Sequence, residues 1–105
     1  FWEGVENDFS PTYLRHMYSS VKEIAKDKPI IISETGWPSD GDKTENAEPS
    51  KFNAMKYFIN VNNWARKEKI KIFYFSSFDE AWKIHHEGDV GQTWGIWNED
   101  EKLKF

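Results

Sequence analysis

Helical segments and strand-like segments alternate along the chain, and this order limits the folds that the chain can adopt. Residues 11–26 and 49–67 carry apolar side chains at helical spacing, and each is followed by a short run rich in β-branched and aromatic residues, at 29–34 and 70–75. Strands separated by a helix pair in parallel through a right-handed connection. The sequence therefore predicts an α/β fold with a parallel sheet.

The boundaries of these segments carry their own signals. Ser10 and Pro11 suit the cap and the first position of a helix, and Pro29 ends it because the residue before a proline is pushed towards extended backbone. The run at 29–34 lacks polar alternation, which predicts a strand buried on both faces. Residues 92–97 and 102–105 predict a short hairpin.

Composition excludes several classes of function. The chain has 14 basic and 18 acidic side chains, a net charge of −4, which argues against a nucleic-acid-binding surface and against docking on an anionic membrane. Without cysteine it can form neither a disulfide scaffold nor a cysteine-type zinc site. No apolar run approaches the roughly 20 residues of a membrane helix. The chain begins with Phe1 rather than methionine, so we expect a piece of a longer protein.

Aromatic residues are abundant, with 6 Trp, 4 Tyr and 8 Phe among 105 residues, more than the core of one small domain requires. Trp64 lies within a helical segment and is expected to pack. A tryptophan in a loop is either a lid over the core or a platform for a sugar ring, and the sequence leaves both open for Trp37, Trp82, Trp94 and Trp97.

Carboxylates stand at the expected strand ends. Glu34 closes the first strand, and Asp79 and Glu80 follow the second. The carboxyl ends of parallel strands are where α/β proteins build their sites. A carboxylate there is partly desolvated, which costs free energy unless it is hydrogen-bonded or used, although a solvated loop acid is the alternative. Two carboxylates in one cleft beside tryptophan indicate glycoside hydrolysis.

A metal site is the competing interpretation of His85 and His86, which lie beside Glu87 and Asp89. Adjacent histidines point in different directions, and no third ligand recurs at a known spacing. We therefore expect neither a metal nor a cofactor.

Four segments together resemble one family. Residues 31–39, Ile-Ile-Ser-Glu-Thr-Gly-Trp-Pro-Ser, resemble the nucleophile segment of glycoside hydrolase family 17, the β-1,3-glucanases and related glucanosyltransferases. Residues 74–83 are similar to the next strand end of that family, with Phe-Asp-Glu and a lysine three residues after the glutamate. Residues 87–97 resemble the closing segment of its microbial branch, and residues 1–4 resemble the end of the strand before the first helix.

The resemblance implies the last third of a (β/α)8 TIM barrel: the end of strand six, helix six, strand seven, helix seven, strand eight and a closing loop or hairpin. Residues 1–105 would then be the C-terminal segment of a single glycosidase domain whose N-terminal part is absent. It also implies that Glu34 is the nucleophile of a retaining mechanism. The family carries its general acid/base in an Asn-Glu pair on strand four, which this chain lacks, because its Asn98-Glu99 lies in the expected turn.

The resemblance further implies a set of substrate-binding or accessory residues: Glu80, Lys83, Trp37, Trp82 and Trp2. The charge of Lys83 would hold Glu34 or Glu80 ionised. The implied partners are a β-1,3- or β-1,6-linked glucan and the remainder of the same barrel, and the implied location is extracellular, cell-wall or periplasmic. Hydrolysis and transfer are not separated, because both pass through one glycosyl-enzyme intermediate.

Two other functions compete with this interpretation. A non-catalytic carbohydrate-binding module would use the loop tryptophans, but such modules are usually all-β. A small flavodoxin-like domain with a signalling or interaction role would need more strands than the sequence contains.

Overall fold

The fold begins with two helices and two strands in alternation. In the computed structural model, which describes all residues 1–105, these elements are α1 (Ser10–Ala25), β1 (Ile31–Thr35), α2 (Lys51–Glu68) and β2 (Lys71–Tyr74). The strands form a two-stranded parallel sheet, in which Ile31 lies opposite Lys71 and Ile32 opposite Ile72. The predicted α/β class is confirmed.

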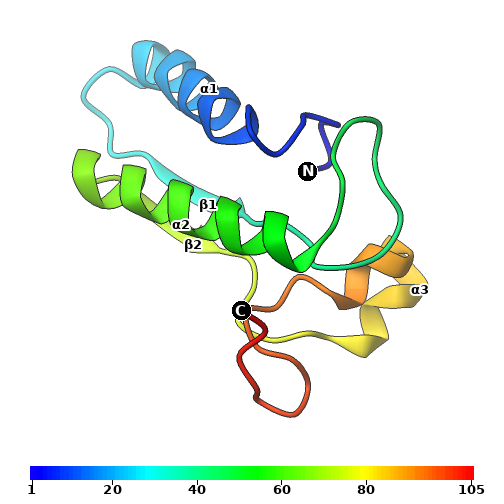
Figure 1. Ribbon diagram of the computed structural model, residues 1–105. Helices are drawn as coiled ribbons and strands as arrows, with labels where there is room; N and C mark the ends of the chain where they lie inside the picture. Colours follow the sequence, from blue (N-terminus) through cyan, green and yellow to red (C-terminus); the bar gives the residue numbers. More distant parts are fainter.

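The loops that follow the strands gather at one end of the molecule. Figure 1 shows α1 and α2 running alongside the strands, and it shows the N-terminal residues, the loop at 36–50 and the segment at 76–105 at the carboxyl ends of β1 and β2. The last segment holds three short helices, η1 (Ala81–Lys83), α3 (Ile84–Glu87) and η2 (Asp89–Gln92), where the sequence predicted only a polar loop.

Both ends of α2 are set by local sequence. The Ser50 hydroxyl accepts a hydrogen bond from the Asn53 N–H at 3.0 Å, which satisfies one of the donors that a helix start leaves free. Lys69 ends the helix in the left-handed conformation, with φ of 55°. Arg66 and Lys67 in the last turn complement the negative end of the helix dipole.

The start of α1 differs from the expected cap. Ser10 is the first residue of the helix, and its hydroxyl donates to the carbonyl oxygens of Val5 at 3.1 Å and Glu6 at 3.0 Å. Ser10 therefore ties the helix to the residues before it, while Pro11 takes the early helical position that suits it.

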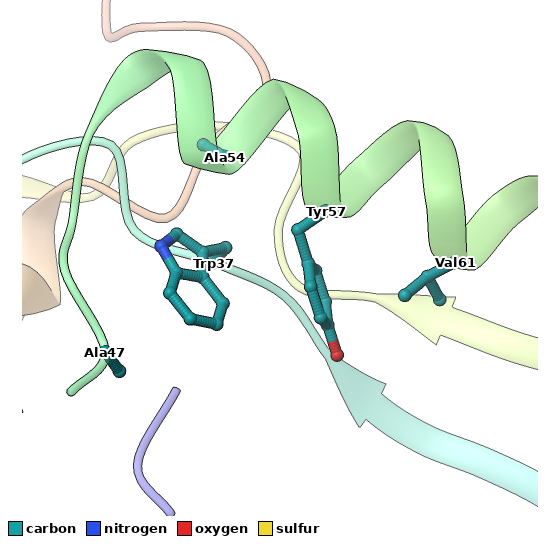
Figure 2. Close-up of a cluster of buried hydrophobic side chains, with 5 residues drawn as sticks. All are labelled: Trp37, Ala47, Ala54, Tyr57 and Val61. Atoms are coloured by element: carbon teal, nitrogen blue, oxygen red, sulfur yellow. The ribbon is translucent and has the colours of Figure 1, made fainter. Parts of the chain in front are cut away.

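The core lies between α2 and the loop that follows β1. Figure 2 shows its five buried side chains, Trp37, Ala47, Ala54, Tyr57 and Val61. Trp37 is 1% exposed and lies with its ring centroid 5.4 Å from that of Tyr57. The predicted packing role of Trp64 is confirmed, because its ring is buried and meets the edge of Tyr18 at 5.8 Å.

The expectation that the strand at 29–34 is buried on both faces is wrong. Ile31 in β1 is 51% exposed, and Phe73 in β2 is 66% exposed. The sheet has only two strands, and α1 and α2 leave these two side chains uncovered. Along α1, Met17, Val21 and Ile24 are exposed in the same way. None of the helices combines the length and the apolar composition that a membrane-spanning helix needs.

The expected hairpin at 92–97 and 102–105 does not form as paired strands. One isolated antiparallel bridge joins Trp97 to Leu103. Beside it the Lys104 N–H donates to the Ile96 carbonyl at 3.0 Å and the Asn98 N–H to the Lys102 carbonyl at 2.9 Å, so the two segments pair only next to the turn. The first segment also bonds to the chain after β2: the Ser76 N–H donates to the Trp94 carbonyl at 3.1 Å, and the Ile96 N–H donates to the Ser76 carbonyl at 3.0 Å. These bonds hold residues 92–97 against the chain that leaves β2.

Candidate active site

A pocket of about 210 Å³ lies at the carboxyl end of β1. We call it the Glu34 pocket, because Glu34 and the two residues after it contribute to its wall. The remaining walls come from the N-terminal residues, α1, α2 and the segment after β2: Phe1, Trp2, Glu3, Val5, Ser10, Tyr13, Leu14, Tyr57 and Trp94. The pocket thus combines one strand-end carboxylate with several aromatic rings.

The Glu34 carboxylate is available to a ligand. Glu34 is exposed, although it is the fourth residue of a five-residue strand. Its side chain accepts no hydrogen bond from the chain and has no lysine, arginine or histidine nitrogen within ion-pairing distance. Thr35, the next residue, is buried, and its hydroxyl lies 2.8 Å from that of Tyr57. The backbone that carries Glu34 is therefore anchored while its side chain is free.

Gly36 allows the ends of the two strands to meet. The Phe75 N–H donates to the Thr35 carbonyl at 2.8 Å, which brings the chain after β2 against the chain after β1. A Cβ atom on Gly36 would lie 1.8 Å from the Phe75 carbonyl oxygen, so no other residue fits. The chain can consequently turn at Gly36, two residues after Glu34, so that the residues that follow do not fill the pocket.

Trp2 and Trp94 form the aromatic wall of the pocket, with ring centroids 5.8 Å apart. The two differ in exposure, because Trp2 is 53% exposed while Trp94 is 5% exposed and shows only part of its ring. Glu3 and Tyr13 also line the pocket, with the Tyr13 hydroxyl 3.4 Å from Glu3 Oε2. Sequence reasoning missed both, although Glu3 lies beside Trp2 in the quoted Phe-Trp-Glu-Gly segment.

The structure places Trp37 in the core, which corrects the expectation that it walls a sugar subsite. Its indole N–H donates to the Glu48 carbonyl at 2.9 Å, and the ring is almost fully buried. The turn at Gly36 directs the next side chain away from the pocket and towards α2. No ring face of Trp37 is left for a ligand.

Glu80 and Lys83 pair with each other rather than with Glu34. Lys83 forms an ion pair with Glu80, and its ammonium nitrogen lies 4.1 Å from the Phe75 ring centroid. Neither residue lines the Glu34 pocket. Of the two carboxylates expected beside Lys83, the structure therefore places Glu80 and not Glu34 in contact with it.

Trp82 lies outside the Glu34 pocket and offers its ring to solvent. It is 60% exposed, and its closest aromatic neighbour is His86, at 6.0 Å between ring centroids. An exposed indole face on the surface that also carries Glu80 and Lys83 can stack on a sugar ring.

Asp79 is not a free carboxylate. Its Oδ1 accepts a hydrogen bond from the Lys104 ammonium group at 2.6 Å, and the two side chains are 15% and 6% exposed. Burial lowers the pKa of Lys104, and the neighbouring Asp79 partly opposes that effect. Asp79 thus serves the packing of the C-terminal segment, and the sequence could not distinguish it from Glu80.

No three His, Asp or Glu side chains lie close enough together to hold a metal ion. His85 and His86 are exposed in α3.

An accessible carboxylate at the end of a parallel strand, in a pocket walled by tryptophan, is typical of enzymes that act on carbohydrates. Comparison with known proteins identifies the family within this class. Residues 1–95 match the family model of the BtgE/BtgC glycoside hydrolase domain. The chain belongs to this domain family and, with the relatives below, to glycoside hydrolase family 17, as the resemblance indicated.

Three relatives illustrate the kinship. A glucan 1,3-beta-glucosidase of Arthroderma benhamiae is 32% identical over the whole chain, and one of Saccharomyces cerevisiae is 34% identical over 70% of it. The glycoside hydrolase family 17 beta-1,3-glucanosyltransferase of Rhizomucor miehei is 34% identical over 98% of the chain, with a TM-score of 0.90. An active-site mutant of that enzyme has been solved in complex with laminaritriose. The chain spans only 38%, 24% and 37% of these proteins, respectively.

Proposed function

We propose that this chain is the C-terminal part of a (β/α)8 barrel that cleaves or transfers β-1,3- or β-1,6-linked glucan with retention of configuration. In this assignment α1 and α2 are helices six and seven, β1 and β2 are strands seven and eight, and residues 76–105 close the barrel. The proposal rests chiefly on one observation: Glu34 lies free at the end of β1, in an aromatic pocket, in a chain that superposes closely on a glucanosyltransferase.

In the proposed mechanism the Glu34 carboxylate attacks the anomeric carbon and forms a covalent glycosyl-enzyme intermediate. Retaining enzymes place a second carboxyl group roughly 5–5.5 Å away, which first donates a proton to the leaving oxygen and then accepts one from water or from an acceptor sugar. We assign that group to another strand of the barrel, outside residues 1–105. The Asn98-Glu99 pair is a poor substitute, because Glu99 accepts a hydrogen bond from the Ala81 N–H at 3.1 Å in the closing segment.

The other side chains have supporting roles in this proposal. Trp2 provides an exposed apolar face on which a glucosyl ring can lie beside Glu34, and the mostly buried Trp94 supports it from behind. Trp82 and the partly exposed Glu80 form a second surface that would contact a longer glucan, and the buried Lys83 holds Glu80 in place through their ion pair. Family kinship also supports a location outside the cytoplasm.

The nucleophile assignment can be tested in the intact protein that carries this chain. Glu34→Gln is expected to lower turnover by several orders of magnitude and to leave glucan binding nearly unchanged, because the amide cannot attack. Glu23→Gln, at an exposed position of α1, is the matched control. A 2-deoxy-2-fluoro glucoside, whose intermediate hydrolyses slowly, should label the peptide that contains Glu34.

The outcomes separate the proposal from its alternative. Label on a peptide without Glu34, or normal turnover of the Glu34→Gln variant, would reject the nucleophile assignment. Glucan binding by an intact protein that turns over no glucan would instead favour the carbohydrate-binding function, for which the exposed rings of Trp2 and Trp82 provide the platforms.

A further inference from the structure

Trp94 is a wall of the Glu34 pocket that no regular secondary structure holds in place. It lies between η2 and the C-terminal residues, in a segment without helix or strand. Its ring meets those of Phe1 and Phe75 at 5.6 Å each, so small movements of its backbone would change the shape of the pocket. The Ser76 N–H donates to the Trp94 carbonyl at 3.1 Å and fixes one point of this backbone, so the bonds of the neighbouring residues decide how it is oriented.

The residues on either side of Trp94 are both bonded to one ion pair. The Gly95 N–H donates to Asp79 Oδ1 at 2.9 Å, and the Lys104 ammonium group donates to the Thr93 carbonyl at 3.1 Å. Asp79 and Lys104 are also bonded to each other, as described above. A Cβ atom on Gly95 would lie 2.2 Å from the Asp79 nitrogen, so the two segments touch without an intervening side chain.

Stability alone is a weak explanation for this ion pair. Taking two charges out of water costs free energy that their attraction often fails to offset, and apolar residues of similar size often serve as well. An apolar pair could not form the hydrogen bonds that run from both charged groups to the backbone on either side of Trp94. The same charges would also be costly to separate, which makes the arrangement rigid.

We propose that Asp79 and Lys104 are positioning residues that hold Trp94 as a wall of the Glu34 pocket, so that the C-terminal Lys104 acts on glucan binding without touching the glucan. This inference rests on the proposed function for its effect on glucan. Its structural part, the placement of Trp94 by the ion pair, does not depend on that function.

The first experiment reads the position of Trp94 directly. The intact protein is labelled with 5-fluorotryptophan, and the Trp94 resonance is assigned by its loss in Trp94→Phe. Lys104→Met is expected to shift or broaden this resonance. Lys102→Met is the matched control, because Lys102 is exposed and bonds only through its backbone.

The second experiment reads the consequence for glucan. Lys104→Met should raise the KM for laminari-oligosaccharides by roughly ten- to hundred-fold, as small misplacements in a binding site do, with a smaller change in kcat. In a Trp94→Phe background the same substitution should have a much smaller effect, because the two residues act as one unit.

Several results would overturn the proposal. One is an unchanged Trp94 resonance in Lys104→Met, and another is an equal rise in KM with and without Trp94. If Lys104→Met does not fold, the apolar double variant Asp79→Leu/Lys104→Met replaces it, because it removes both charges together with both backbone bonds. A wild-type resonance and KM in that variant reject the proposal. Normal turnover of Glu34→Gln would show separately that the Glu34 assignment has failed. In that case the resonance measurement still tests whether the ion pair positions Trp94.

Discussion

The hydroxyl groups of Thr35 and Tyr57 lie 2.8 Å apart in a buried hydrogen bond that joins the end of β1 to α2. Thr35 directly follows Glu34, so this bond fixes the backbone from which the proposed nucleophile projects. Tyr57 belongs to the buried core and also lines the Glu34 pocket. The helix that stabilises the fold thus also orients the strand end that carries the site.

Tyr57→Phe and Thr35→Val are each expected to lower the free energy of unfolding of the intact protein by about 1–3 kcal/mol, because each leaves a buried hydroxyl unpaired. The double variant should cost less than the sum of the two, since it removes both polar groups together. Denaturant titration measures all three, with Tyr13→Phe at an exposed position as the control. Strictly additive losses would show that the bond contributes little.

The tryptophans are expected to divide into two groups. Trp2→Ala and Trp82→Ala should weaken laminari-oligosaccharide binding, measured in the Glu34→Gln background, by a loss of roughly 1–3 kcal/mol for each aromatic contact. Trp37→Ala should instead lower the free energy of unfolding by about 3–5 kcal/mol, because it empties the core. Unchanged affinity in both exposed variants would mean that glucan does not stack on these rings.

Alkaline solutions are expected to destabilise the protein through two tyrosines. Burial raises the pKa of Tyr57, with the Thr35 hydroxyl partly opposing, and burial together with nearby Tyr57 raises the pKa of Tyr74. Above pH of about 10 these tyrosines lose their protons in the unfolded chain but keep them in the folded one. The free energy of unfolding therefore falls as pH rises, by up to about 1.4 kcal/mol per pH unit for each tyrosine.

Tyr74→Phe isolates this effect, because the Tyr74 hydroxyl makes no hydrogen bond within the chain. The lowered pKa of Lys104 acts in the opposite sense, but only below the ordinary lysine pKa of about 10.5. Denaturant titrations at several pH values above about 10.5 should therefore show a shallower pH dependence in Tyr74→Phe than in the wild type. Equal slopes would contradict the assignment.

Residues 1–105 alone are expected to fold poorly and to turn over no glucan. Both edges of the two-stranded sheet are unpaired, and Ile31, Phe73 and Ile24 are exposed. The free energy gained by burying apolar side chains is therefore small compared with the cost of ordering the chain, about 1–2 kcal/mol per residue. A thermal melt and sedimentation of the isolated segment test this, and we expect a broad transition and self-association. A cooperative, monomeric transition would contradict the folding part. Turnover that Glu34→Gln abolishes would show that a group within the segment supplies the proton.

Local sequence predicted the elements because their signals depend on near neighbours. Helical periodicity, the β-branched runs and the position of Pro29 placed both helices and both strands within a few residues of their observed bounds. The hairpin predicted at 92–97 and 102–105 forms only beside its turn, because residues 94–97 also bond to Ser76 and Ser77 after β2, which the local sequence does not indicate.

The α/β order, the family and the position of Glu34 at a strand end could be predicted from the sequence, because each depends on short motifs that can be recognised before the chain is folded. The folded chain was needed to show that Trp37 is buried while Trp94 lines the pocket, and that Lys83 pairs with Glu80 while Lys104 pairs with Asp79. Burial and ion pairing depend on which distant segments meet, and local motifs do not specify this. Both tryptophans lie in loops, and only the folded chain distinguishes the ring that fills the core from the ring that lines the Glu34 pocket.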